Sequence, residues 1–360
     1  MQYSSLVQIV SNIVKSVLVF ALFSILPPKV YYLSMATLIA GIVTFVGNYF
    51  VTKKLFKDFG IEKRLFNFEK LMTLLKSGFW VLISNISNLL LNGLDLLFSN
   101  WFISSVMMGR LSLAKQIPLA LSNALGVFSN IFSSALTKVF ATDGNNSLID
   151  EATEQLKILT IFFTVPYAGI IAYGKDFLKL WLRATEYTES QYTEIYVLMI
   201  LVLLDIIIST YMYSIHSVFI AIDRVKVYSV ILFMASLISM SVTLILLKFT
   251  ELGVYAIAGT STIVLGFTHG VIVPGCAAKL LKKPIWLFWK SELKSWISLA
   301  VTSTLFGAIK FFLVLNNWKH FFISIMIVAA LGYFTLFFIT FDKNEKREFV
   351  KIIKDKLSNE

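Results

Sequence analysis

A polar stripe runs along the third hydrophobic segment of the chain. Asn85, Asn88, Asn92 and Asp95 are spaced three, four and three residues apart. On a helix this spacing places all four side chains on one narrow face, with apolar residues covering the rest. A charged residue at the bilayer centre costs roughly 2.5–3.5 kcal/mol, so the stripe is expected to face protein or water rather than lipid. Amides and a carboxylate on a wet face predict hydrogen bonding to a polar cargo.

Two other segments carry similar stripes. In the fourth segment, Gln116 and Asn123 are seven residues apart, and in the first, Lys15 shares a face with Gln8 and Asn12. Interhelical hydrogen bonds in membranes average only about 0.6 kcal/mol, which is too little to explain so many polar groups as glue. The stripes therefore favour a water-lined cavity. For Lys15 two interpretations remain open: a cavity role, or snorkelling or pairing with a carboxylate.

The composition places these stripes in a membrane protein. The 360 residues are 57% hydrophobic and include 32 phenylalanines, well above the 45–50% apolar content of soluble domains. Because a bilayer core needs about 20 apolar residues per helix, the sequence predicts an all-α polytopic membrane protein with ten transmembrane helices. The expected segments are 6–26, 30–52, 78–103, 113–136, 158–174, 193–219, 227–248, 253–276, 295–315 and 321–341.

The positive charge is distributed unevenly between alternate loops. One set of loops, with the C-terminal tail, carries 22 Lys and Arg residues and the other set carries 8. By the positive-inside rule both termini are expected in the cytoplasm. The net charge of +11 is thus explained by topology, with no nucleic acid as partner. The first segment is followed by nine more and has no cleavage site, so it is not read as a signal peptide.

The sequence offers little for catalysis or cofactor binding. Cys276 is the sole cysteine, and the three histidines lie in separate segments without metal-ligand spacing. There is no phosphate-binding loop, dinucleotide fingerprint or zinc-protease motif. We therefore expect no enzyme activity, no cofactor and no metal.

Two basic stretches divide the chain. Residues 53–76 predict an amphipathic helix on the cytoplasmic face, and residues 279–294 carry Trp286 and Trp289 where an interfacial belt is expected. The expected organisation is two helices over 1–52, the linker 53–76, six helices over 77–278, the linker 279–294, two helices over 295–341, and a cytoplasmic tail over 342–360.

Several stretches resemble the polysaccharide and O-antigen flippases. They are YGKDFLKLWL at 173–182, the helix pair at 219–264, LKSGFWVLISNISNLLLNGLDLLFSN at 75–100, and the turn MMGRLSLAKQIP at 107–118. The likeness covers essentially the whole chain and rests on pattern more than on any invariant signature. It implies the fold of the multidrug/oligosaccharidyl-lipid/polysaccharide exporters, with two six-helix lobes.

The resemblance also implies a function and partners. The substrate class is an undecaprenyl-diphosphate-linked oligosaccharide, such as an O-antigen or other surface polysaccharide unit, turned across the bacterial cytoplasmic (inner) membrane. Besides membrane lipids, polysaccharide polymerase machinery is an expected partner. Family members have twelve to fourteen helices, so four helices of the first lobe are expected to be missing. An internal start, a split gene whose other product supplies them, and a nonfunctional remnant remain open.

The chemistry of this expected cargo suggests a role for each candidate residue. Its diphosphate calls for cations, with Lys15 and Arg110 as candidates, and its hydroxyls call for the amides at 85, 88, 92, 116 and 123. Arg110 is read equally well as an interfacial anchor. Asp95 and Asp205 are candidates for coupling transport to a proton or sodium ion, or for a structural pair with Lys15 or Arg110.

Two other functions stay open. A small-molecule antiporter of the same superfamily would favour a compact acidic cavity. A membrane glycan polymerase or ligase generally needs a large outer loop, and the longest expected here is about 17 residues.

Overall fold

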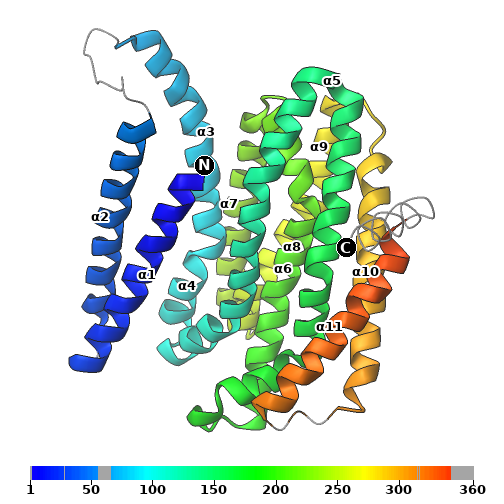
Figure 1. Ribbon diagram of the computed structural model, residues 1–360. Coiled ribbons are helices and arrows are strands. Elements are labelled where there is room, and N and C mark those ends of the chain that lie inside the picture. Colours follow the sequence, from blue (N-terminus) through cyan, green and yellow to red (C-terminus); the bar gives the residue numbers. More distant parts are fainter. Residues whose placement is uncertain (1, 28, 56–65, 314, 316, 342–360) are drawn as a thin grey trace, which may run out of the picture. The chain divides into compact units, whose positions relative to one another are not determined.

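A computed structural model describes residues 2–27, 29–55, 66–313, 315 and 317–341. The described residues are helical, without strands, and the chain divides into two units, Met1–Thr73 and Leu74–Glu360. Figure 1 shows their helices. Within the described ranges, eight helices are long and apolar enough to cross a membrane. The all-α, multi-pass membrane class predicted from composition is confirmed.

Unit 1 is built around a helical hairpin. Helices α1 (Gln2–Ile25) and α2 (Val30–Leu55) pack through small residues, and the buried side chains among its described residues are Ser11, Ala36 and Ala40. The Ser11 hydroxyl donates to the Ala40 carbonyl over 2.7 Å, and the Thr44 hydroxyl donates to Ser11 Oγ over 2.8 Å. The hairpin thus buries little beyond this polar seam.

The third predicted segment is interrupted. Helix α3 (Phe68–Asn92) is followed at Gly93 by the short helix α4 (Leu94–Phe102). A Cβ at Gly93 would lie 2.7 Å from the Leu89 carbonyl oxygen, so a side chain does not fit there. Of the expected linker 53–76, α2 takes the start and α3 the end, while residues 56–65 fall outside the described part of the chain.

Unit 2 contains the remaining helices. The long α5 (Ser105–Trp181) contains two predicted segments and changes direction at Gly144, whose φ of 81° falls in the region that favours glycine. Figure 1 shows its two halves side by side. They are followed by the 3₁₀ turn η2 (Arg183–Thr185), α6 (Glu189–Ala221), α7 (Val225–Phe249), α8 (Val254–Phe267), the π-helix η3 (Thr268–Ile272), α9 (Val273–Leu280), α10 (Trp286–Lys310) and α11 (Trp318–Thr340).

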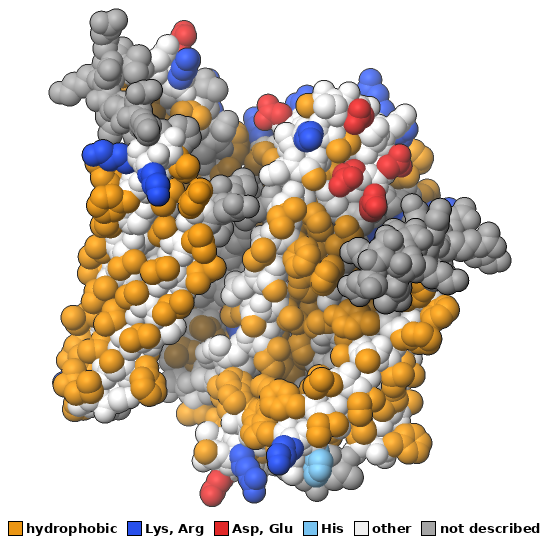
Figure 2. All heavy atoms as spheres, in the orientation of Figure 1, with side chains coloured by type: hydrophobic (Ala, Val, Ile, Leu, Met, Phe, Trp, Pro, Cys, Tyr) orange, Lys and Arg blue, Asp and Glu red, His pale blue; other side chains and the backbone are white. Residues whose placement is uncertain are grey.

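Large side chains form the interior of unit 2. Tyr167, Tyr173, Tyr211, Phe219 and Phe306 are among its fully buried residues. Buried tyrosines are satisfied: Tyr173 donates to the Phe306 carbonyl over 3.0 Å, as expected for a polar tip inside a core. Figure 2 shows charged side chains gathered toward the two ends of this unit, with apolar side chains over the band between them. That distribution suits a protein whose middle lies in hydrocarbon.

Candidate functional site

A cavity of about 860 Å³ lies within unit 2, among α3, α5, α6, α7 and the α8–α9 segment. Its polar lining comes from several helices. The polar residues are Ser84, Asn85, Asn88, Asn92, Ser122, Asp205, Ser209, Tyr213, His216, Tyr228 and His269. Among the described lining residues there is no lysine or arginine. The cavity therefore offers many hydrogen-bonding groups and one carboxylate.

Helix α3 aims its amides at the cavity. Asn85, Asn88 and Asn92 all line it, as the three-four spacing predicts. Ser87, on a neighbouring face of α3, does not line the cavity and is buried by packing instead. The hydroxyls of Ser84 and of Ser229 on α7 lie 2.8 Å apart and join the two helices. The amides are thus presented from a helix whose rotation is set by its packing.

Asp95 is held by a buried ion pair. Lys115 Nζ lies 2.7 Å from Asp95 Oδ2 and also donates to the Asn92 carbonyl over 3.0 Å. The partner is neither Lys15 nor Arg110, the two cations considered from sequence. Lys115 both neutralises the acid and satisfies a carbonyl at the break between α3 and α4, as a buried charge requires. Asp95 does not line the cavity.

Asp205 is the carboxylate that lines the cavity. It is 8% exposed, and its Oδ1 has no hydrogen-bond partner among the described residues. One turn along α6, the Ser209 hydroxyl lies 3.4 Å from His269 Nδ1. His269 belongs to η3, and such π-helical turns are frequent at functional sites. One wall of the cavity thus carries a carboxylate, a hydroxyl and an imidazole ring, from Asp205, Ser209 and His269.

Sequence reasoning missed part of this wall. The sequence pattern leaves His269 isolated and does not single out Tyr213 or Tyr228, yet all three line the cavity. The rings of His216 and Tyr228 lie 4.2 Å apart between centroids. For Tyr213 the available signal is its spacing from Asp205, Ser209 and His216, which share one face of α6.

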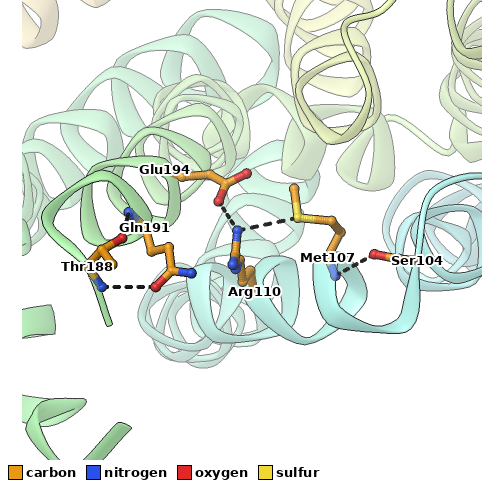
Figure 3. Close-up of polar contacts among 6 residues, drawn as sticks. All are labelled: Ser104, Met107, Arg110, Thr188, Gln191 and Glu194. Carbon is orange, nitrogen blue, oxygen red and sulfur yellow. Dashed lines mark hydrogen bonds and ion pairs between the residues drawn. The ribbon is translucent and has the colours of Figure 1, made fainter. Parts of the chain in front are cut away.

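Other predicted residues lie away from the cavity. Gln116 and Asn123 are exposed and do not line it, while Ser122 does. Arg110 forms an ion pair with Glu194 of α6 and contacts the Met107 sulfur, as Figure 3 shows. Because Arg110 is paired, the structure fits its interpretation as an interfacial anchor better than its interpretation as a cation that binds the diphosphate.

Lys15 belongs to unit 1. It borders a shallow groove formed by α1 with Leu33 of α2, together with Ser16 and Phe20. Its side chain is partly exposed there.

The chain is similar in sequence and in fold to known membrane proteins. Residues 1–140 match the family described as polysaccharide biosynthesis protein. The uncharacterized membrane protein EpsK of Bacillus subtilis (strain 168) is 20% identical over 347 residues, covering 96% of this chain and 67% of that protein. The fold is similar to the lipid II flippase MurJ in an inward closed conformation, with a TM-score of 0.59, 16% identity, and coverage of 93% of this chain and 66% of that one. The chain thus spans about two thirds of the length of each relative.

Proposed function

We propose that the chain is a member of the polysaccharide and lipid flippase family, and that it carries an undecaprenyl-diphosphate-linked oligosaccharide across the bacterial cytoplasmic membrane by alternating access. The observation that supports this most is the cavity of about 860 Å³ in unit 2, whose lining places three asparagines and several hydroxyls among apolar residues. Amides and hydroxyls can donate to and accept from sugar hydroxyls, which matches a glycan better than an apolar cargo. An O-antigen or another surface polysaccharide unit is the proposed glycan.

The cavity is suited to the sugar part of this cargo. Its described lining lacks cations, whereas a diphosphate is best bound by Lys or Arg. Lys15, partly exposed in unit 1, remains the candidate for the diphosphate. Arg110 is the weaker candidate because Glu194 already pairs with it.

Of the two acids, Asp205 is the better candidate for ion coupling. Asp95 is neutralised by Lys115, while Asp205 lines the cavity with one oxygen unpartnered among the described residues. A carboxylate in this position can take up a proton or a sodium ion during the cycle. The charge asymmetry of the loops supports an orientation with both termini in the cytoplasm. We expect transport rather than catalysis.

The first test removes the cavity amides. The double variant Asn85→Leu/Asn88→Leu replaces two exposed, cavity-lining amides by a side chain of similar size. Losing two hydrogen bonds worth about 0.5–1.5 kcal/mol each should lower surface glycan display roughly tenfold or more in cells that depend on this gene. Asn100→Leu, on α4 and away from the cavity, is the matched control. Normal display in the double variant at equal protein level contradicts the proposal.

A second function has one specific observation in its favour. A cavity of about 860 Å³ falls in the range of about 300–1,000 Å³ that holds small ligands, and Asp205 lines it, as in a cation-coupled small-molecule antiporter. Asp205→Asn distinguishes the cases in proteoliposomes. Lost drug or cation efflux with intact glycan transport favours the antiporter, and lost ion dependence of glycan transport favours the flippase.

A further inference from the structure

Aromatic side chains form one part of the wall of the large cavity in unit 2. Tyr213 and His216 of α6 and Tyr228 of α7 all line it. His216 lies eleven residues beyond Asp205 on the same helix, which places the two roughly 16 Å apart along the helix axis. These three side chains, the aromatic wall, are therefore a different part of the cavity from the wall that carries the carboxylate.

The rings of the aromatic wall are packed against one another. Those of His216 and Tyr228 lie 4.2 Å apart between centroids, and those of Tyr213 and His216 lie 5.9 Å apart and nearly perpendicular. The buried Phe219 supports Tyr228 at a centroid distance of 5.8 Å. The three lining side chains are only partly exposed. Because they hold one another in place, little conformational freedom remains to be lost when a ligand binds.

The amides of α3 lie beside the aromatic wall. The hydroxyls of Ser84 on α3 and Ser229 on α7 are 2.8 Å apart. Asn85 follows Ser84 in the chain and Tyr228 precedes Ser229, and both Asn85 and Tyr228 line the cavity. The contact between the two serines therefore brings an amide and an aromatic ring to the same level of the cavity.

An aromatic ring beside an amide is a combination that fits a sugar. A pyranose carries hydroxyl groups around its edge and C–H groups on its two faces. The C–H groups of one face can pack against aromatic side chains, while the hydroxyls exchange hydrogen bonds with an amide. A purely apolar ligand would leave the amides of Asn85 and Asn88 unpaired, which weakens binding.

The charges of the cavity restrict the kind of sugar. Its described lining contains the carboxylate of Asp205 and no lysine or arginine. The carboxylate of an acidic sugar, such as a uronic acid, would be enclosed there without a counter-charge from the lining. Burying an unpaired charge is unfavourable. An uncharged sugar does not incur this cost.

We propose that Tyr213, His216 and Tyr228 form a subsite for one uncharged pyranose ring of the cargo, which stacks on these side chains and hydrogen-bonds to Asn85. The inference rests on the proposed function, because it names the sugar that the cavity receives. The short turn that joins α6 to α7 lies close in the chain to both His216 and Tyr228. This turn is cytoplasmic in the orientation proposed from the loop charges, so the subsite lies toward the side from which the cargo enters.

The test is saturation-transfer NMR on the purified full-length protein in lauryldimethylamine oxide, a detergent without sugar. The probes are the methyl glycosides of β-D-glucopyranose, β-D-galactopyranose and α-D-mannopyranose, with sorbitol as an open-chain polyol and methyl β-D-glucuronide as an acidic sugar. Stacking predicts that, in at least one glycoside, the axial protons of one face receive more saturation than those of the other. Sorbitol should receive little, and the glucuronide should bind about threefold or more weakly than the glucoside.

Variants at Tyr228 separate the ring from its hydroxyl. Tyr228→Leu removes the ring and keeps an apolar side chain, so it should raise the Kd of the best-bound glycoside about threefold to tenfold. Tyr228→Phe keeps the ring and should hold the Kd within about twofold. Tyr333→Leu is the matched control, because Tyr333 is 42% exposed on α11 and does not line the cavity. The pattern of saturation in the unaltered protein tests the stacking even if Tyr228→Leu does not fold.

The outcomes separate this inference from the transport proposal. If Asn85→Leu/Asn88→Leu loses surface glycan while none of the three glycosides shows face-selective saturation, transport stands and the aromatic subsite is wrong. Equal losses of affinity in the leucine variants at 228 and 333 also overturn the subsite. Saturation of sorbitol equal to that of the glycosides overturns stacking, and a glucuronide that binds as tightly as the glucoside overturns the preference for an uncharged sugar.

Discussion

The two units are both helical and apolar, but they bury their side chains by different means. In unit 1 the buried side chains among the described residues are Ser11, Ala36 and Ala40, while much of α1 and α2 is exposed. In unit 2 buried tyrosines, phenylalanines and a lysine–aspartate pair fill the interior. Without a hydrophobic driving force between helices in lipid, small residues and hydrogen bonds suffice to hold a hairpin. A cavity with a defined polar lining needs the more rigid second type of packing.

The two units should differ most in the free energy of unfolding that is lost when a buried polar group is removed from each. Lys115→Leu leaves Asp95 buried without a counter-charge and should cost about 3–5 kcal/mol of the free energy of unfolding. Ser11→Ala removes the hairpin's polar seam in unit 1 and should cost about 0.6 kcal/mol. Denaturation in mixed micelles measures both.

The double variant Asp95→Leu/Lys115→Leu separates charge from packing. It should recover most of the stability lost in Lys115→Leu, because no unpaired charge remains. If the single variant Lys115→Leu is as stable as Ser11→Ala, the ion pair of unit 2 does not have the role assigned to it.

A buried acid should give unit 2 a pH dependence. Glu292 of α10 lies outside the predicted membrane segment 295–315 and is 7% exposed; its burial raises the pKa of the carboxyl from the ordinary 4.5 to about 8. The folded state therefore holds the proton more tightly than the unfolded state. Stability should be lost as the pH rises from about 4.5 to about 8, by at most about 5 kcal/mol in total.

Glu292→Gln tests this assignment. The amide does not ionise, so the variant should gain stability relative to the natural chain as the pH rises across that window. Thermal unfolding in detergent at a series of pH values provides the measurement. Parallel curves for the two proteins would show that Glu292 is not the titrating group.

A smaller difference in stability is expected when either of two glycines, one in each unit, is replaced by alanine. The nearest atom that an added Cβ would meet is equally close at both. A Cβ at Gly332 would lie 2.6 Å from Phe306 Cζ, and one at Gly47 would lie 2.6 Å from Val7 Cγ1. Phe306 is 1% exposed and fixed in the core, whereas Val7 is partly exposed and has room to turn. Gly332→Ala should therefore cost about 1–3 kcal/mol and Gly47→Ala less.

Gly307→Ala is the control for both glycines, since a Cβ there would meet nothing within 4 Å. It should be neutral or slightly stabilising, because alanine favours helix more than glycine does. Equal costs for the variants at 332 and 47 would mean that the two units resist overpacking alike.

Much of the fold could be predicted from local pattern. Apolar runs of about 20 residues indicate the membrane helices, and the spacing of Asn85, Asn88 and Asn92 indicates the face that lines the cavity. Both features depend on helix geometry within one segment, which the order of residues determines directly. The same spacing places Asp205 and Ser209 on one side of α6.

Contacts between segments were not predictable in the same way. Lys115 pairs with Asp95 across 20 residues of chain, and no periodicity selects it over Lys15 or Arg110. On α5 the cavity receives Ser122 rather than Asn123, a difference of one residue, or about 100° around the helix axis. The π-helical turn that carries His269 is likewise invisible in the apolar pattern of its segment.

The sequence by itself thus determined that the chain is an all-α membrane protein and which face of α3 carries the amides that line the cavity. The tertiary structure alone decided which acid is neutralised, which is left with an unpartnered oxygen in the cavity, and which rings from α6 and α7 meet on its wall. The physical reason is that hydrophobic periodicity sets the direction of a side chain relative to its own helix. Its partners depend on the rotation and depth at which that helix packs against the others.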